Sequence, residues 1–243
     1  MTLLLGRYQD VLADVEVDLT CADPPYGSRT HEGQATGEMA SRGDRGGVSL
    51  RPPIPYDHWT ATDVHAFVGF MAPRTKGWLA CMTCSDLIND YRDAYENNGL
   101  VSFAPVPCVI PAMTCRMAGD GPSSWAVYLM VGRPKALFKW GTLRGSYSAK
   151  RGAGVKRNRC LGGKPLPLMT QIVRDYSRPG DLVCDPCAGH ATTLVAAKLT
   201  GRRFIGAEMD PGRHAAGLAR LDGTIAEGQT PIEMLARKNG SLL

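Results

Sequence analysis

The stretch from residue 181 to residue 211, DLVCDPCAGHATTLVAAKLTGRRFIGAEMDP, constrains the fold more than any other part of this 243-residue chain. An apolar, strand-like run ends in Asp185, a short loop leads into a helical apolar pattern, and a second strand-like run ends in Glu208. Two strands joined through a helix are parallel neighbours in a sheet. Ligands of such sheets bind at loops that follow the carboxyl ends of strands. The loop after Asp185 is therefore a predicted ligand site.

The same alternation of strands and helices runs through most of the chain. Apolar runs predict strands at residues 2–6, 17–23, 77–83, 100–106, 125–132, 181–185 and 202–208. Helical patterns begin near Thr60, at Ser85 as an N-cap, at Pro165, at residue 191 and at residue 211. In the helix near Thr60, one buried stripe is predicted: Val64, Phe67, Val68 and Met71. These patterns predict an α/β domain, with a mostly parallel sheet and helices on both faces.

The loop after Asp185 has the wrong chemistry for a dinucleotide. It carries one glycine, Gly189, in place of a GxGxxG pattern, and it begins with a carboxylate that would repel a pyrophosphate. A carboxylate instead favours a positively charged ligand. Glu208 comes 23 residues after Asp185, near the spacing of about 20 residues at which an acid accepts ribose hydroxyls. S-adenosylmethionine has an ammonium, a sulfonium and a ribose, and fits this pattern; an ordinary tight turn with a surface glutamate is the alternative.

A second motif, CADPPYGSR at residues 21–29, ends the strand predicted at 17–23. Pro24 and Pro25 hold φ near −65° and have no N–H, so the corner is stiff and presents only acceptors. The alternative is a strand end followed by a proline-rich turn. The motif comes first in the chain and the predicted cofactor loop comes last, which is the reverse of the order usual in dinucleotide folds.

Three segments together, DLTCADPPYG, GGKP and DLVCDPCAGHATTLVAAKLTGRRFIGAEMD, resemble the amino-group DNA methyltransferases of the β group. Those enzymes methylate N6 of adenine or N4 of cytosine, and the resemblance covers about residues 3–221. It implies a Rossmann-like class I methyltransferase fold with a circularly permuted motif order and a short basic target-recognition insertion. It also implies base flipping, because an exocyclic amine cannot be reached inside a duplex.

The resemblance assigns roles to individual positions. The target base would be held by Asp23, Pro24, Pro25 and Tyr26. S-adenosylmethionine would be held by Asp185, Pro186, Cys187, Ala188, Gly189, His190, Thr192, Thr193 and Glu208, with Lys164 near its methionine end. The loop departs from the family's pattern at Cys187 (usually aromatic), His190 (usually small and polar) and Ala191 (usually glycine). The alanine matters only where a positive φ or a very close approach is required.

A basic stretch separates the two motifs. Residues 121–174 contain no acid, although the chain has 23. Nine cations lie between residues 133 and 159 and are predicted to bind nucleic-acid phosphates: Arg133, Lys135, Lys139, Arg144, Lys150, Arg151, Lys156, Arg157 and Arg159. Phe138, Trp140 and Tyr147 are candidate stacking or wedge residues; a solvated loop is the alternative. Because the segment is short, we expect short or relaxed sequence specificity.

These motifs divide the chain into a catalytic half at 1–132, a target-recognition segment at 133–163, a cofactor half at 164–222 and a tail at 223–243. A glycine-rich loop at 27–51 follows the first motif and would close over a flipped base. The net charge of +5 favours a polyanionic partner. DNA is the expected partner, with a homodimer left open. We expect no membrane segment and a cytoplasmic location, since no apolar run approaches membrane-spanning length.

Two CxxC pairs, Cys81–Cys84 and Cys184–Cys187, have spacing that zinc sites use. Their apolar, strand-like surroundings instead predict cysteines that act as small hydrophobes, and we expect no metal. The leading hypothesis is N6-adenine methylation of DNA, in a setting such as restriction-modification. Cytosine-N4 methylation, RNA methylation and a non-catalytic nucleic-acid-binding scaffold are the alternatives.

Overall fold

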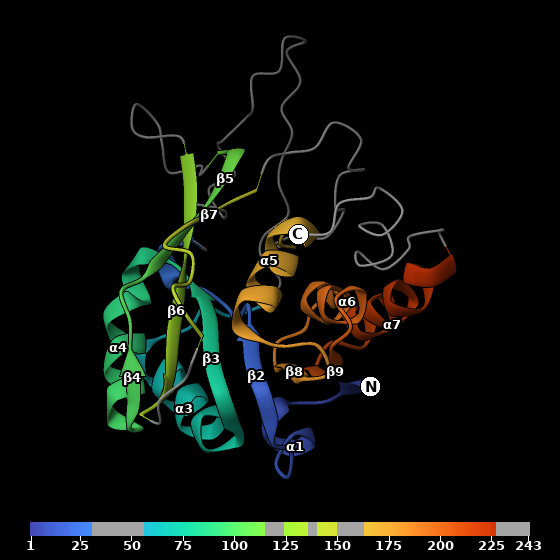
Figure 1. Cartoon of the computed structure of the whole chain (residues 1–243), viewed down its shortest axis with the longest axis horizontal. Helices are drawn as coiled ribbons and strands as arrows, with labels where there is room; N and C mark the ends of the chain where they lie inside the picture. Colours follow the sequence, from blue (N-terminus) through green and yellow to red (C-terminus); the bar gives the residue numbers. More distant parts are fainter. Residues whose placement is uncertain (31–55, 115–123, 136–139, 150–162, 227–243) are drawn as a thin grey trace.

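In the part of the chain that the structure describes, the strands form one nine-stranded sheet in the order β1-β9-β8-β2-β3-β6-β5-β7, with β4 also paired to β6 (Figure 1). The computed structural model describes residues 1–30, 56–114, 124–135, 140–149 and 163–226. The strands are β1 (Thr2–Leu5), β2 (Val17–Ala22), β3 (Thr75–Thr83), β4 (Leu100–Ser102), β5 (Val106–Thr114), β6 (Ser124–Pro134), β7 (Tyr147–Ser148), β8 (Leu182–Asp185) and β9 (Arg203–Glu208).

Five neighbouring strands, β1, β9, β8, β2 and β3, pair in parallel. Beyond β3 the sheet becomes mixed, because β6 pairs antiparallel with β3, β4 and β5. The predicted mostly parallel α/β architecture is confirmed. The single strand predicted at 100–106 is wrong: β4 ends at Ser102, residues 103–105 belong to no strand, and β5 starts at Val106. Pro105 has no N–H with which to continue the ladder.

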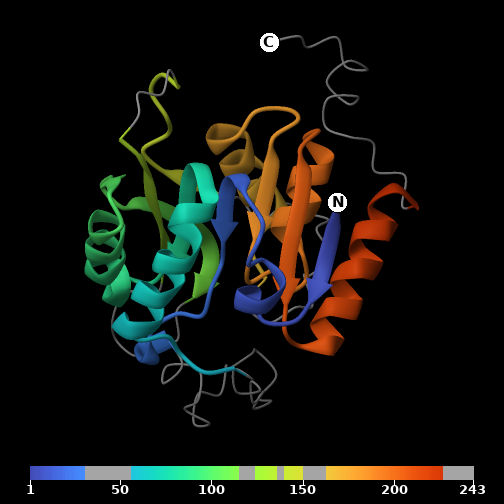
Figure 2. The ribbon, with the colours of Figure 1, turned by 90° about the horizontal axis from the view of Figure 1, so that it is seen from below.

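The helices cover both faces of the sheet, as the alternating pattern predicts. They are α1 (Tyr8–Val11), α3 (Ala61–Met71), α4 (Ile88–Asn97), α5 (Leu166–Tyr176), α6 (Thr192–Leu199) and α7 (Pro211–Ala226), with 3-10 turns η1 (Ala72–Arg74) and η2 (Ser85–Leu87). Figure 2 shows α3 and α4 on one side of the sheet and α5 and α6 on the other. Within the described residues, no helix is long and apolar enough to cross a bilayer.

Two predicted helix starts can be compared directly with the structure. The start of α3 is as expected: the Thr60 backbone N–H donates to Asp63 over 2.8 Å, and the predicted stripe of Val64, Phe67, Val68 and Met71 is buried. The start at Ser85 is wrong as an N-cap. The chain there makes the turn η2, capped by Cys84, and the α-helix begins only at Ile88.

The two edges of the sheet differ in what they carry. The carboxyl ends of β2, β8 and β9 meet at one edge, because these strands are adjacent and parallel. A cleft of about 350 Å³ lies toward the other edge, lined by residues 13–16 before β2 and by Pro73 and Arg74 before β3. The sequence motifs fall on the first edge, so this cleft is not the candidate site.

Candidate functional site

Three acids stand at the carboxyl edge of three neighbouring strands. Asp23 follows β2 directly, Asp185 is the last residue of β8, and Glu208 is the last residue of β9. They lie close enough that Asp23 and Glu208 both help to raise the pKa of Asp185. The structure thus brings together the first motif and the predicted cofactor loop, which are more than 150 residues apart in the chain.

Asp185 is the most strongly perturbed of the three acids. Its side chain is 2 % exposed, and burial raises its pKa from the ordinary value to about 7. Hydrogen bonds from the Thr193 hydroxyl and the Cys187 backbone N–H, the latter over 3.1 Å, act in the opposite direction. A buried carboxylate with few compensating donors favours a cationic ligand, which would restore its ionised form.

Glu208 joins the two loops that flank the site. One carboxylate oxygen accepts the Gly189 N–H over 2.8 Å, and the other accepts the Asp210 N–H over 2.9 Å. The side chain is 6 % exposed. Each carboxylate oxygen has a second lone pair, so Glu208 can hold both loops and still accept further hydroxyl donors.

The backbone of the loop after Asp185 is tightly specified. Ala191 has φ 60°, and among the described residues it alone combines a positive φ with a side chain larger than hydrogen. Gly189, with φ 51°, has open space where a Cβ would stand. Gly206 and Gly217 pack closely against neighbouring side chains. A Cβ added at Gly206 would lie 2.8 Å from Leu194, and one added at Gly217 would lie 2.8 Å from Leu3. The condition under which the alanine matters is therefore met, since a left-handed alanine costs about 1–2 kcal/mol.

The corner formed by residues 23–27 is held from three directions. The Tyr26 hydroxyl donates to Asp23 Oδ1 over 2.9 Å, and Lys164 Nζ donates to Asp23 Oδ2 over 2.7 Å. The Tyr26 carbonyl accepts the Trp59 N–H over 3.0 Å, and the Gly27 N–H points to Cys84 Sγ at 3.3 Å. Lys164 is 5 % exposed, and its ammonium lies over the Tyr26 ring, 4.9 Å from the centroid. Lys164, which is predicted to lie near the methionine end of the cofactor, thus contacts the motif that is predicted to hold the target base.

Tyr56 and Arg213 also border the site, although neither is among the residues predicted from the sequence. The Arg213 guanidinium lies over the Tyr56 ring, 4.8 Å from its centroid. Burial and then the charge of Asp23 raise the pKa of Tyr56, with a smaller contribution from Glu208. Tyr56 follows a glycine-rich segment and belongs to no periodic pattern, so local sequence carries no signal for it.

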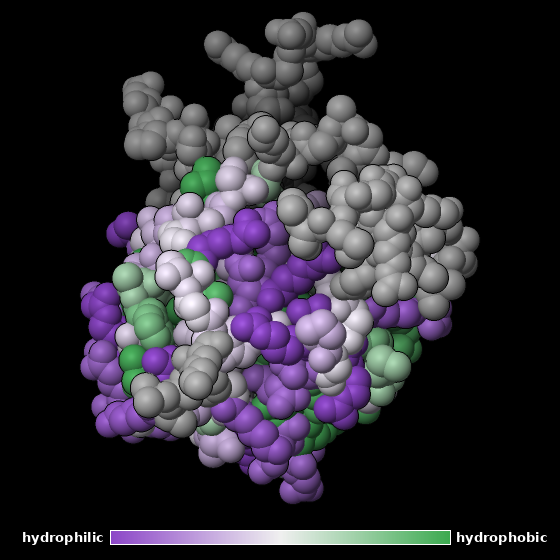
Figure 3. All heavy atoms as spheres, in the orientation of Figure 1, coloured by the Kyte–Doolittle hydropathy of each residue, from purple (hydrophilic) through white to green (hydrophobic). Residues whose placement is uncertain are grey.

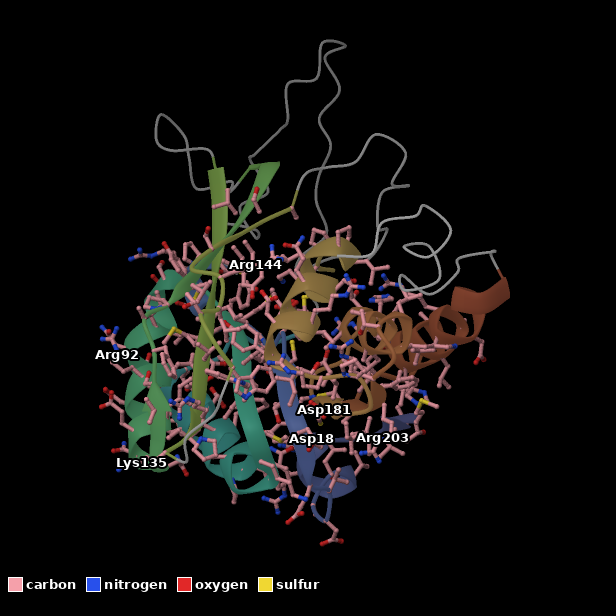
Figure 4. All side chains as sticks on the ribbon, viewed as in Figure 1. Asp18, Arg92, Lys135, Arg144, Asp181 and Arg203 are labelled. Carbon is pink, nitrogen blue, oxygen red and sulfur yellow. The ribbon has the colours of Figure 1, made fainter. Side chains whose placement is uncertain are left out.

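The predicted phosphate-binding residues are divided by the structure. Lys139, Lys150, Arg151, Lys156, Arg157 and Arg159 lie outside the described residues, as do Phe138 and most of the 27–51 loop. Arg144 lies beside α5, where its side chain pairs with Asp175 at 3.0 Å (Figure 4). Arg133 and Lys135 lie at the carboxyl end of β6. This end pairs with the first part of β3 and is far from the edge that carries Asp23.

Two aromatic residues of the basic stretch are packed into the protein. Tyr147 is 2 % exposed and donates its hydroxyl to Asp175 over 2.7 Å, so the prediction that it stacks on bases is wrong. Trp140 lies edge-on to Trp78 and under the Arg178 guanidinium, 3.7 Å from its ring centroid. Within the described ranges, no group of three or more His, Cys, Asp or Glu side chains is arranged to hold a metal.

Comparison with known proteins agrees with this geometry. Residues 145–218 match the family model described as DNA methylase. This segment of the chain is similar to DNA methylases. Two curated relatives match parts of the chain: the DNA adenine methyltransferase YhdJ of Escherichia coli K12 is 40% identical over 82 residues, and the type II methyltransferase M1.MboII of Moraxella bovis is 47% identical over 47 residues. These matches span 32% and 19% of this chain, and 27% and 18% of the relatives.

Two solved DNA methyltransferase structures resemble nearly the whole chain in fold. M1.HpyAVI in complex with SAM has a TM-score of 0.67 at 19% identity, covering 91% of this chain and 98% of that one. The cytosine-N4-specific PvuII DNA methyltransferase has a TM-score of 0.64 at 14% identity, covering 90% and 85%. At these identities the likeness establishes the fold, a Rossmann-like methyltransferase sheet.

Proposed function

We propose that the chain is an S-adenosylmethionine-dependent DNA methyltransferase that acts on the N6 amine of adenine. The observation that carries the proposal is the meeting of Asp23, Asp185 and Glu208 at one edge of the sheet, with Lys164 paired to Asp23. Three acids and one buried ammonium are a suitable environment for a ligand that is itself both cationic and anionic. The DNA adenine methyltransferase among the relatives supports the choice of substrate.

The residues present fit S-adenosylmethionine. Asp185 is a buried carboxylate whose ionised form needs a cationic partner, and Glu208 has acceptor capacity for ribose hydroxyls. Gly189 leaves open space beside the loop, so a ligand can approach the backbone closely. Bound there, S-adenosylmethionine would supply the activated methyl group on its sulfonium.

The chain's own part in the reaction is to prepare the amine. An exocyclic base amine is a poor nucleophile, because its lone pair is delocalised into the ring. Asp23 and the Pro24 carbonyl would accept the two amine hydrogens and so favour the tetrahedral geometry that frees the lone pair. As the methyl bond forms, positive charge develops on nitrogen, and the fixed Asp23 carboxylate favours that charge without reorganising water. One amine proton then leaves to solvent, so Asp23 need not act as a full base.

The remaining contribution is positioning. Pro24 and Pro25 fix the backbone of the corner, and the contacts of Tyr26 with Asp23 and Trp59 hold the corner in place. The Tyr26 ring would support the flipped base, so that the amine faces the cofactor. The described surface on the face shown in Figure 3 is largely hydrophilic, which suits a polar partner such as DNA.

Cytosine N4 is the second candidate, because a cytosine-N4-specific methyltransferase has the same fold with a TM-score of 0.64. Both targets are exocyclic amines, and the Asp23 corner can accept hydrogens from either. One experiment separates them. The chain is incubated with unmethylated DNA and S-adenosylmethionine, the DNA is digested to nucleosides, and the products are identified by mass spectrometry.

We expect N6-methyl-2′-deoxyadenosine as the product, and sequencing of the modified DNA should show a short or relaxed site. N4-methylcytosine as the product would replace the adenine proposal with the second candidate. Methylation of RNA but not of DNA would refute both the adenine and the cytosine proposal. A calorimetric titration that shows no binding of S-adenosylmethionine or S-adenosylhomocysteine would also refute both. A strict six-base site would contradict the expected specificity while leaving the chemistry intact.

A further inference from the structure

We propose that Lys164 is a positioning residue with two alternative partners, and that its exchange between them makes the target-base pocket depend on bound cofactor. In one arrangement, the one seen here, its ammonium holds Asp23 and covers Tyr26. In the other it pairs with the carboxylate of bound S-adenosylmethionine and leaves Asp23 and Tyr26 to the base. This inference rests on the proposed function.

A single side chain engages both groups that the target base would need. Lys164 Nζ lies 2.7 Å from Asp23 Oδ2, and it lies 4.9 Å from the centroid of the Tyr26 ring. The other carboxylate oxygen, Asp23 Oδ1, already accepts the Tyr26 hydroxyl. A base that stacks on the Tyr26 face and donates an amine hydrogen to Asp23 therefore has to take space and an acceptor that Lys164 occupies.

Burial limits where the Lys164 ammonium can go. The Lys164 side chain is 5 % exposed, whereas Asp23 is 22 % exposed, so the cation is the more deeply buried partner. A desolvated ammonium is strongly destabilised when it loses its anion. Of the other two acids at this edge, Glu208 already accepts two backbone N–H groups. Asp185 is the acid that the proposed function assigns to the ammonium of the cofactor. A carboxylate introduced by a ligand is the best replacement for Asp23.

The chemistry also requires that Lys164 leave Asp23 before methyl transfer. Positive charge develops on the target nitrogen beside Asp23, and an ammonium held at the same carboxylate would oppose it. The two arrangements of Lys164 therefore differ in their capacity for base binding and for reaction. Binding of a ligand with a carboxylate near Lys164 should promote binding of the flipped base, and the coupling should be reciprocal.

The test compares two ligands that share an adenosine but differ in the carboxylate. DNA affinity is measured by fluorescence anisotropy on an unmethylated duplex that contains the sequence on which the chain acts. It is measured without ligand, with S-adenosylhomocysteine, and with 5′-methylthioadenosine, which lacks the amino-acid part. We expect S-adenosylhomocysteine to tighten DNA binding about fivefold or more. Saturating 5′-methylthioadenosine should change it less than about twofold.

Three variants then assign the effect to one side chain. Lys164→Met removes the charge and keeps the length, and it should bind DNA with an affinity that no longer depends on S-adenosylhomocysteine. Lys164→Arg retains a cation and should keep part of the coupling. Lys76→Met is the matched control, since Lys76 is exposed and pairs with Glu16 on the surface; it should behave as the unaltered chain. Thermal unfolding of each variant checks that the fold is retained.

The outcomes separate this inference from the function on which it rests. If the unaltered chain methylates DNA and binds S-adenosylhomocysteine, but Lys164→Met keeps the full coupling, the role of Lys164 is refuted and the function stands. Equal effects of the two ligands would refute it as well. If the unaltered chain neither methylates DNA nor binds S-adenosylhomocysteine, the proposed function fails, and the inference fails with it.

Discussion

The two edges of the parallel sheet carry the same kinds of residue and do different things with them. At the amino edge, Asp18 lies at the start of β2, Asp181 precedes β8 and Arg203 begins β9 (Figure 4). At the carboxyl edge, Asp23, Asp185 and Glu208 end the same three strands. The sequence alone presents these two sets of charges as near equivalents, since each strand is flanked by an acid or a base on both sides.

Burial and partners distinguish the edges. Asp18 is 39 % exposed, accepts the Leu182 N–H over 2.8 Å, and lies 4.0 Å from the exposed Arg203 guanidinium. Such groups tie loops together and stay hydrated. At the carboxyl edge, Asp185 and Glu208 are almost fully buried, and the pKa of Asp185 is raised to about 7. The amino edge is thus satisfied within the protein, whereas the carboxyl edge has charge that a ligand would stabilise.

The comparison is tested most strongly by removing one acid from each end of β2. Asp23→Ala should lower methyl transfer by roughly 10²–10³-fold, because the developing charge on the amine loses its fixed carboxylate. Initial rates with labelled S-adenosylmethionine and DNA measure the loss. Calorimetric titration should show that cofactor binding persists, since the substitution acts on the target side of the site.

Asp18→Ala is the matched control at the amino edge. It should leave the rate within about twofold and lower the free energy of unfolding by about 1–3 kcal/mol, because the Leu182 N–H loses its acceptor. If Asp18→Ala impaired methyl transfer as much as Asp23→Ala, both effects would be structural, and the functional difference between the edges would be refuted.

The second comparison sets Asp185 against Asp181, at the two ends of β8. Asp185→Asn should weaken binding of S-adenosylhomocysteine by about 10–100-fold, through loss of the charge opposite its ammonium. In the unaltered chain, affinity should fall as the pH drops below about 7, because protonation of Asp185 removes the same charge. Titrations between pH 5.5 and 8.5 measure both effects. Asp181→Asn should keep the affinity and its pH dependence; a pH-independent affinity in the unaltered chain would exclude Asp185 as the partner.

The contrast between the edges also explains how much could be read from sequence. The strand ends and their acids were predicted, because apolar runs that stop at a charge are local signals and parallel neighbours share an edge. The buried stripe of α3 is also predictable from local sequence, because its apolar residues recur at i, i+3, i+4 and i+7. The contact between Lys164 and Asp23 joins residues 141 positions apart, and only packing decides that this lysine reaches Asp23.

Tertiary structure can override what a local pattern suggests. Arg133 and Lys135 belong to a basic, acid-poor run, yet β6 runs antiparallel to β3 and carries them to the end of the sheet away from Asp23. Tyr147 is an aromatic residue in a basic stretch and is therefore a candidate for stacking on bases. Its ring is buried, however, and its hydroxyl donates to Asp175. Charge and aromaticity indicate a partner, and strand direction determines whether a side chain can reach it.

The same two aspartates test stability. The pKa of Asp185 is higher in the folded chain, about 7, than the ordinary value near 4, so the folded state holds the proton more tightly. Stability from this group is fully present below about pH 4 and is lost as the pH rises to about 7, by at most about 4 kcal/mol. Asp185→Asn should therefore raise the melting temperature at pH 8 more than at pH 5, and Asp181→Asn should not. A lower melting temperature for Asp185→Asn at pH 8 would contradict the assignment.

The smallest expected effect concerns the backbone. At the amino edge the left-handed positions are glycines, Gly180 (φ 90°) and Gly201 (φ 74°), whereas the loop at the carboxyl edge places Ala191 at φ 60°. Gly201→Ala should lower the free energy of unfolding by about 1 kcal/mol, because an exposed Cβ there meets only the left-handed penalty. Ala191→Gly should raise it by less than about 1 kcal/mol, since relief of that penalty is partly offset by the loss of a buried methyl group. Urea unfolding measures both, with Ala197→Gly inside α6 as the control that must destabilise. If Ala191→Gly destabilised as much as this control, the left-handed alanine would carry no strain, and the two edges would not differ in their backbones.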